Sequence, residues 1–304
     1  MTTHWQSFFD RWAAPPSQTE IDERNRTERQ IKAALLASPA VARRNFRLFV
    51  KGSYRSGTNV RRGPDVDLAV ELLGASESEQ NSIVHKAFGA QELPLAQLGL
   101  REAPIEYRHA LKTFKDDCFD ALVDAFGPTQ VDRHNKCIRV SEKSTTLPAD
   151  VVPCATHRRY DSVVTYHDGI EITPDQGHKI INWPQQDYDN GVRKNDRTSR
   201  RYKRVVRGLK ALENRMAELG LPETPSWLVE CLVYNVPNSV FDSPSNYVNV
   251  FSTLLWLSKE LESTTGRGEW HEVNELKYLF ASTQPWSIQD AQSFVSQAMR
   301  FLAP

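Results

Sequence analysis

The sequence predicts an α+β protein, with a mixed β-sheet in the first half and helices in the second. Short segments in which apolar and β-branched residues alternate with polar ones or run together, typical of strands, occur at residues 46–51, 65–72 and 150–154. Apolar residues at helical spacing then dominate residues 196–302. The turn-rich stretch HKIINWPQQDYDNG lies between these two halves and marks the expected change from sheet to helices.

The stretch KGSYRSGTNVRRGPDVDLAVEL, residues 51–72, carries the most informative pattern in the chain. Asp65 and Asp67 open a strand, and because side chains alternate along a strand, both point to the same face. Two neighbouring carboxylates repel each other unless a proton or a divalent cation lies between them. Gly52 and Ser53 precede the acids, and a glycine lets backbone amides approach a phosphate closely. An isolated Asp-x-Asp is equally compatible with a turn acid followed by a solvated strand acid.

A third acid, Asp150, begins the β-branched run in LPADVVPC. We expect one sheet to carry the three acids, with helices behind it. Oxygen ligands of this kind, close to a phosphate, are those that Mg²⁺ prefers.

The remaining elements follow from periodicity and capping signals. Trp5, Phe8, Phe9 and Trp12 form one aromatic stripe on a short helix, which we expect to dock onto the body of the protein. Ser17 and Glu20 predict a capping box for a helix that runs towards residue 36. Further strands are predicted at 136–140 and 160–166, and further helices at 81–88, 116–126, 226–234, 245–261 and 287–302.

The predicted helix at residues 196–219 is strongly basic on the faces outside its apolar stripe. Charged helix faces are usually solvated, and this explains most of these side chains. Lys203, Arg207 and Lys210, however, lie at i, i+4 and i+7, on one face from which they would reach a phosphate.

Composition excludes several classes of protein. The 304 residues include 38 basic and 38 acidic ones, so net charge gives no reason to expect bulk attraction to nucleic acid or to membranes. No run reaches the ~18 apolar residues of a membrane span. The four cysteines form no CxxC pair, which favours buried free thiols in a reducing compartment over a zinc site. We therefore expect a soluble, cytoplasmic protein.

Five segments together resemble one known family. They are GSYRSGTNV, PDVDLAVEL, ADVVPC, NGVRKNDRTSRRYKRVVRGLKAL and PSWLVECLVYNVP, and they run from about residue 46 to residue 237. Their order is similar to that of the polymerase-β-like nucleotidyltransferases, and within them to the cyclic GMP-AMP synthase and oligoadenylate synthase branch. The chain most resembles the bacterial CD-NTases, the cyclic-oligonucleotide synthases of CBASS anti-phage defence.

The resemblance implies a polymerase-β-like core at residues 1–173, a helical lobe of the oligoadenylate-synthase type at 174–304, and a cleft between them. It implies that Asp65, Asp67 and Asp150 are catalytic and hold two Mg²⁺ or Mn²⁺ ions. The nucleotide-binding residues that it implies are Gly52, Ser53, Arg55, Lys203 and Ser226. Pro225 precedes Ser226, so that serine is also compatible with a plain helix cap.

Nucleoside triphosphates (ATP, GTP, UTP or CTP) are the implied substrates, and a cyclic di- or trinucleotide is the implied product. The product would act as a second messenger on a separate effector, with possible CBASS accessory proteins as partners. No requirement for DNA or a membrane is expected. Two alternatives remain open: nucleotidyl transfer to a tRNA, a protein or a small molecule, and a nucleotide sensor without catalysis.

Overall fold

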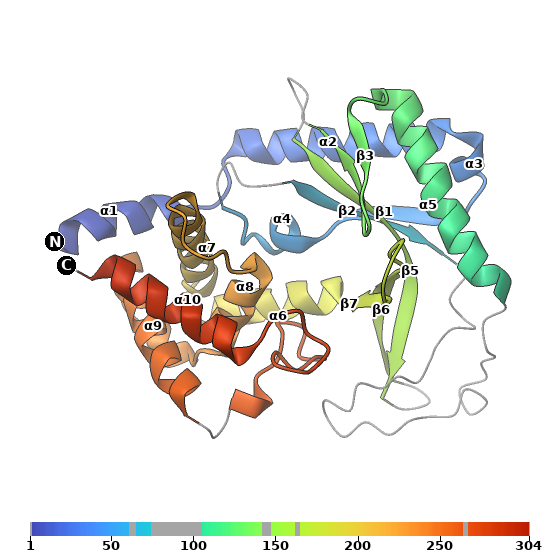
Figure 1. Ribbon diagram of the computed structural model, residues 1–304. Helices are drawn as coiled ribbons and strands as arrows, with labels where there is room; N and C mark the ends of the chain where they lie inside the picture. The colour runs from blue at the N-terminus through green and yellow to red at the C-terminus, as the bar shows by residue number, and fades with distance from the viewer. Residues whose placement is uncertain are drawn as a thin grey trace. The chain divides into compact units, whose positions relative to one another are not determined.

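Figure 1 shows the computed structural model of the chain, which describes residues 2–60, 65–73, 105–141, 147–161, 165–263 and 267–303. The predicted helix at 81–88 lies outside these residues. The chain divides into two compact units. The sheet unit contains Ser17–Arg55 and Pro64–Gln185, and the helical unit contains Met1–Pro16, Ser56–Gly63 and Gln186–Pro304. Residues 1–16 thus belong with the helices and residues 174–185 with the sheet, whereas the predicted domains divide at residue 173.

The described strands of the sheet unit form one seven-stranded mixed sheet. Their bounds are β1 (Phe46–Val50), β2 (Val66–Leu72), β3 (Val131–Arg133), β4 (Ile138–Val140), β5 (Ala149–Tyr160), β6 (Tyr166–Ile172) and β7 (Ile180–Asn182). The order is β1-β2-β5-β4-β3, and β6 pairs with both β5 and β7. The β2–β5 pair is parallel and the other pairs are antiparallel, which confirms the predicted mixed sheet.

The strand predicted at 160–166 is wrong. Tyr160 ends β5 and Tyr166 begins β6, and the two residues pair with each other in the antiparallel ladder. The predicted single strand is therefore represented by two antiparallel strands, with Tyr160 in β5 and Tyr166 in β6. The predicted short strand at 150–154 is instead the first part of the twelve-residue β5.

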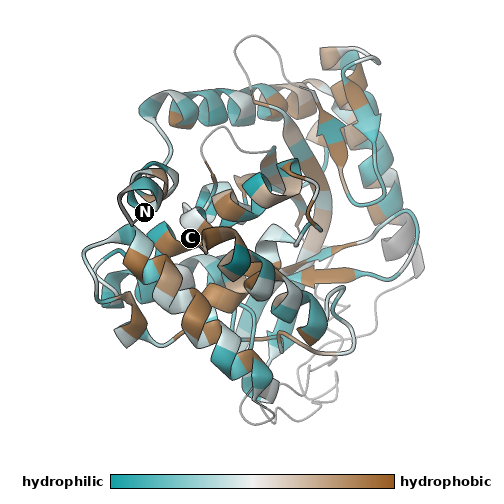
Figure 2. Ribbon diagram, turned by 60° about the vertical axis from the view of Figure 1, so that its left-hand side comes forward, coloured by the Kyte–Doolittle hydropathy of each residue, from teal (hydrophilic) through white to brown (hydrophobic). Residues whose placement is uncertain are grey.

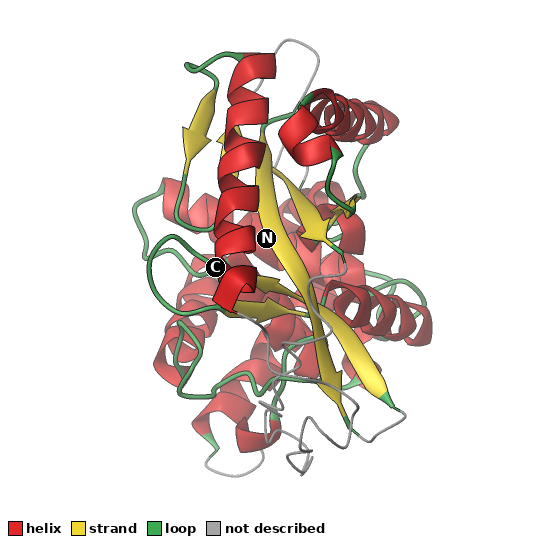
Figure 3. Cartoon of the chain, turned by 90° about the vertical axis from the view of Figure 1, so that its right-hand side faces the viewer, coloured by secondary structure: helices red, strands yellow, loops and turns green. Residues whose placement is uncertain are grey.

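Helices α2 (Gln18–Ala37) and α5 (Ile105–Phe126) pack on the sheet, as Figure 3 shows. Ile31 and Leu35 of α2 and Phe114 of α5 are buried with Leu68 of β2 and Val151 of β5. The predicted capping box is confirmed, since Ser17 and Glu20 cap each other's backbone amides. Leu68 and Val151 each follow an acid by one residue, so Asp67 and Asp150 point to the face of the sheet away from this core.

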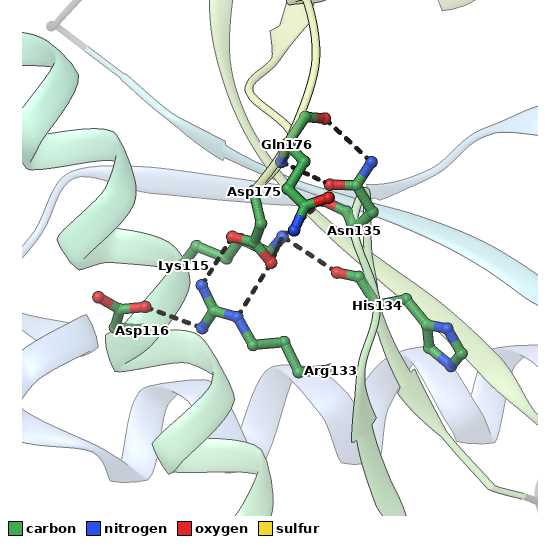
Figure 4. A network of polar contacts seen from close by, with 7 residues as sticks. All are labelled: Lys115, Asp116, Arg133, His134, Asn135, Asp175 and Gln176. Carbon is green, nitrogen blue, oxygen red and sulfur yellow. Dashed lines mark hydrogen bonds and ion pairs between the residues drawn. The ribbon is translucent and has the colours of Figure 1, made fainter.

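A buried lysine fastens the β3–β4 turn to the segment between β6 and β7 (Figure 4). The ammonium of Lys115 donates to the carbonyl oxygens of His134 and Asn135 at 3.1 and 2.8 Å and to Asp175 Oδ2 at 2.9 Å. Arg133 also pairs with Asp175, and its hydrogen bond holds the pKa of that carboxyl below its usual range, as does Lys115. These contacts fix β4, which borders the strand that carries Asp150.

The helical unit consists of α1 (Thr2–Trp12), α6 (Pro184–Arg197, from its third residue), α7 (Tyr202–Glu218), α8 (Ser226–Asn235), α9 (Asn246–Glu262) and α10 (Ile288–Leu302). Hydrophobic and hydrophilic residues share most of these helices in Figure 2, as expected of helices that bury one face. The aromatic stripe of α1 docks within this unit: Phe9 is fully buried, and Trp5 and Trp12 pack against the same core. None of the described helices has the length and apolar character needed to cross a membrane.

The helix predicted at 196–219 begins only at Tyr202. Arg197 ends α6, and Ser199 and Arg200 then adopt left-handed φ values of 50° and 63°. Neither residue is a glycine, so the sequence carries no signal for this break. Within α7, Gly208 permits a close approach of α1, because a Cβ there would lie 3.1 Å from Cδ1 of Phe9.

Two cations of the predicted phosphate-facing row are buried structural residues. The guanidinium of Arg207 donates to the carbonyl oxygens of Ala13 at 2.6 and 2.9 Å and of Gly57 at 2.6 Å. The ammonium of Lys210 lies 2.5 Å from a carboxylate oxygen of Glu230, which also accepts from the Thr58 hydroxyl at 2.8 Å. The prediction that Arg207 and Lys210 are available to a phosphate is therefore wrong. Of the three, only Lys203 is half-buried rather than buried.

Lys210→Met should destabilise the protein by roughly 3–5 kcal/mol, because it leaves the Glu230 carboxylate buried without its cation. The double variant Lys210→Met/Glu230→Gln should recover much of that loss, since the buried charge is then gone. Urea unfolding followed by circular dichroism measures both. A double variant no more stable than the single one would contradict this account of the pair.

Candidate active site

The three predicted acids come together on one face of the sheet. In the parallel β2–β5 pair, Asp67 and Asp150 are directly opposite each other. Asp65 stands two residues before Asp67 and points to the same side. The convergence that the sequence predicted thus follows from strand register, because β2 and β5 are neighbours and each has an acid as its second residue.

Two basic side chains hold two of these carboxylates. Arg139, opposite Asp150 on β4, forms an ion pair with Asp65 at 2.8 Å. Lys51, which follows β1, lies 3.3 Å from Asp67. Sequence reasoning did not single out either residue for the site. The sequence places Arg139 on the predicted strand at 136–140, but that position does not indicate which residue its side chain would contact.

Asp150 has the least favourable surroundings of the three acids. Burial raises the pKa of its carboxyl, and the charges of Asp65 and Asp67 raise it further, against the opposing effect of Arg139. Its Oδ1 atom is buried and has no hydrogen-bond partner within the described part of the chain. An unpartnered oxygen beside two further carboxylates is the arrangement that a divalent cation satisfies.

Gly52 lies against Asp67 and begins the short helix α4 (Gly52–Ser56). Its φ is +65°, and a Cβ there would lie 2.3 Å from Oδ2 of Asp67. The glycine is therefore needed both for the backbone conformation and for the space that the carboxylate occupies. Ser53 follows in α4 and is half-buried.

The donor set fits Mg²⁺ or Mn²⁺, because all three acids offer hard oxygen ligands. Over the described ranges, no three His, Cys, Asp or Glu side chains are grouped closely enough to hold an ion as they stand. The contacts explain why: Arg139 holds Asp65, and Lys51 holds Asp67. Binding a cation would require these carboxylates to exchange a basic side chain for the metal.

The other predicted site residues have varied surroundings. Arg55, in α4, donates to Gln185 and lies over the Phe49 ring at 5.8 Å. Lys203, in the helical unit, lies 5.7 Å from the Tyr188 ring centre, and burial lowers the pKa of its ammonium. Ser226 is the exposed first residue of α8, and the N-cap is Pro225, so the plain cap that the sequence left open for this serine is not observed.

Gly52→Ala should displace the Asp67 carboxylate and weaken Mn²⁺ binding at least tenfold. Gly57→Ala is the matched control, because Gly57 has the same φ of +65° but open space where its Cβ would lie. Both variants should share the backbone penalty of about 1–2 kcal/mol. Calorimetric titration with MnCl₂ separates them, and equal Mn²⁺ affinities would contradict the role given to the contact with Asp67.

Arg139→Met should tighten Mn²⁺ binding by up to about fivefold. The metal would no longer compete with Arg139 for Asp65, and an exposed ion pair of this kind contributes roughly 0.2–1 kcal/mol. Lys179→Met, which frees Glu171 elsewhere on the sheet, serves as the control and should have no effect. The same titration without nucleotide tests this. Weaker binding by the Arg139 variant would show that the arginine supports the site rather than competing for it.

Comparison with known proteins places the chain among enzymes. Residues 189–303 match the family described as the cGAS/DncV-like nucleotidyltransferase C-terminal helical domain. A cyclic dipyrimidine nucleotide synthase from Legionella pneumophila is 36% identical, over 99% of each chain. A cyclic dipurine nucleotide synthase from Elizabethkingia meningoseptica is 33% identical, over 96% of each chain.

Solved structures agree with these matches. The CdnE cyclic dinucleotide synthase of Elizabethkingia meningoseptica, determined with GTP and Apcpp, has a TM-score of 0.77 at 31% identity and covers 98% of this chain and 99% of its own. The c-UMP-AMP synthase of Rhodothermus marinus, with Apcpp and Upnpp, has the same TM-score at 27% identity, over 97% and 95%. The chain belongs to the cGAS/DncV-like nucleotidyltransferases, the CD-NTases, as its sequence indicated.

Proposed function

We propose that the chain condenses nucleoside triphosphates into a cyclic dinucleotide. In each step a ribose hydroxyl oxygen bonds to the α-phosphorus of a triphosphate and pyrophosphate leaves; the second step closes the ring. One observation carries the proposal: Asp67 and Asp150 are opposite each other on parallel strands, with Asp65 beside them and a buried oxygen of Asp150 that has no hydrogen-bond partner among the described residues.

The relatives support the reaction class. They are named as dipyrimidine, dipurine and UMP-AMP cyclic nucleotide synthases, so relatives of similar identity make products with different bases. Two are solved with triphosphates or their analogues. The alternatives of transfer to a tRNA, a protein or a small molecule, and of a sensor without catalysis, have no such support.

In this proposal Asp65, Asp67 and Asp150 hold two Mg²⁺ or Mn²⁺ ions, which supply charge neutralisation at the triphosphate and acidify the attacking hydroxyl. Asp150 is also proposed to accept the hydroxyl's proton, because its buried Oδ1 has no hydrogen-bond partner among the described residues. Lys51 and Arg139 neutralise the acids before the substrate arrives.

Substrate binding is assigned to the remaining predicted residues. Gly52 and Ser53, next to Asp67, present backbone and hydroxyl donors to a phosphate. Arg55 is proposed as a further contact from α4. Lys203 and Ser226, in the helical unit, are proposed as contacts of the triphosphate tail.

The cyclic product would act as a second messenger in CBASS anti-phage signalling. A separate effector would bind it, and accessory proteins of the same system are proposed partners. This step rests on family membership alone.

Asp67→Asn and Asp150→Asn should each lower product formation by at least about 10³-fold while leaving the fold intact, because each removes a charged metal ligand. The assay mixes purified protein, four radiolabelled ribonucleoside triphosphates and Mg²⁺ or Mn²⁺, treats the products with phosphatase and analyses them by mass spectrometry. Asp132→Asn, at an exposed position of β3, is the matched control and should keep full activity.

The outcomes separate the proposals. Phosphatase-resistant cyclic products identify the bases and the linkage. Label transferred to an added tRNA or protein would instead support the acceptor alternative. Full activity in a folded Asp67→Asn variant would refute the assignment of the acids.

A further inference from the structure

A cavity lies wholly within the helical unit. Its volume is about 280 Å³, and its lining includes Arg193, Lys194 and Arg197 of α6, Tyr234 of α8, and His271 and Glu275 of the segment before α10. We call it the α6 pocket. None of the nucleotide-binding or catalytic residues assigned above lines it.

The α6 pocket uses one side of α6. Arg193 and Arg197 are spaced at i and i+4, which keeps them on one face, and Lys194 lies ~100° and ~60° around the helix from them. Tyr188 and Asn195, which contact Lys203, lie about 160° around the helix from that face at ~100° per residue. The pocket is therefore not part of the surface on which Lys203 lies.

The charge of the α6 pocket is unbalanced. It has three cations against one carboxylate, Glu275, and that carboxylate already accepts a hydrogen bond from the Tyr234 hydroxyl at 2.5 Å. Arg193 and Arg197 are exposed, and neither forms an ion pair or a hydrogen bond with any described residue. Like charges at i and i+4 repel, so an anion bound between the two guanidinium groups would reduce the repulsion between them.

Lys194 has a different task, that of fixing the pocket's wall. Its ammonium donates to the Val236 carbonyl at 2.7 Å and to Asn238 Oδ1 at 3.1 Å. It also lies 5.4–5.8 Å from the ring centres of Tyr202, Tyr234 and Phe241. Burial lowers the pKa of Lys194 to about 8, so the group is still mostly charged at neutral pH. Arg193 and Arg197 thus lie beside the positively charged ammonium of Lys194, whose position is fixed by these contacts.

We propose that the α6 pocket binds a small phosphate-bearing ligand, gripped by the guanidinium groups of Arg193 and Arg197. Two guanidinium groups one turn apart can each donate paired hydrogen bonds to phosphate oxygens. A cavity of about 280 Å³ falls just below the range usual for drug-sized ligands, so its size suits a diphosphate or a mononucleotide. The proposal is independent of the reaction proposed above.

The test is calorimetric titration of the full chain in EDTA, where no divalent ion supports phosphate binding at the acids. Pyrophosphate and UMP are titrated separately: tighter binding of pyrophosphate indicates a free diphosphate, and tighter binding of UMP a phosphate ester. Arg193→Gln/Arg197→Gln should weaken binding at least tenfold. Glu275→Gln should tighten it severalfold, because it removes the one acid among the described lining residues while keeping an acceptor for Tyr234.

Two controls separate this site from bulk charge and from the acids. Arg204→Gln/Lys259→Gln removes two exposed cations elsewhere in the helical unit and should leave binding unchanged. Asp67→Asn should also leave it unchanged. The proposal is overturned if the wild-type chain shows no saturable binding, or if the two charge-removing double variants weaken it equally.

Discussion

The parallel pairing of β2 with β5 is the constraint on which the candidate active site depends. It sets Asp67 beside Asp150, although 82 residues separate them in the chain, and it fixes which face of the sheet both acids share. The same register sends Leu68 and Val151 into the core beneath α2 and α5. A slip of one residue would exchange the two sets, burying carboxylates and exposing the apolar residues. The core and the site are thus specified by a single alignment of strands.

Electrostatics determines how the site is kept ready. Three carboxylates on one face would destabilise the sheet if they stood alone, and Arg139 and Lys51 offset that repulsion. Asp150 has no comparable ion pair with any described residue, and its pKa stays raised by burial and by the neighbouring acids. Shifted pKa values of this kind are typical of functional sites, where the fold holds an ionisable group in surroundings that disfavour its charged form.

Patterns that are local in sequence could be predicted, and contacts that depend on tertiary packing could not. Strand alternation and capping signals located β1, β2 and the start of α2, and the spacing of the acids indicated the site. Nothing in the sequence reveals that Arg207 and Lys210 are buried, because their partners, the carbonyls of Ala13 and Gly57 and the carboxylate of Glu230, lie far away in the chain. The break between α6 and α7 was missed for a related reason, since Ser199 and Arg200 adopt a conformation that residue type does not signal.

The contact between Arg207 and Ala13 gives the first turns of the chain a significance beyond their short length. The Arg207 guanidinium donates to the carbonyl of Ala13, at the end of α1, and to that of Gly57. The beginning of the chain is thereby hydrogen-bonded to α7. A shortened protein that starts after Pro16 would lose the hydrogen bonds to Ala13 together with the Phe9 ring that packs against Gly208. An affinity tag is therefore better added ahead of Met1 than exchanged for the opening helix.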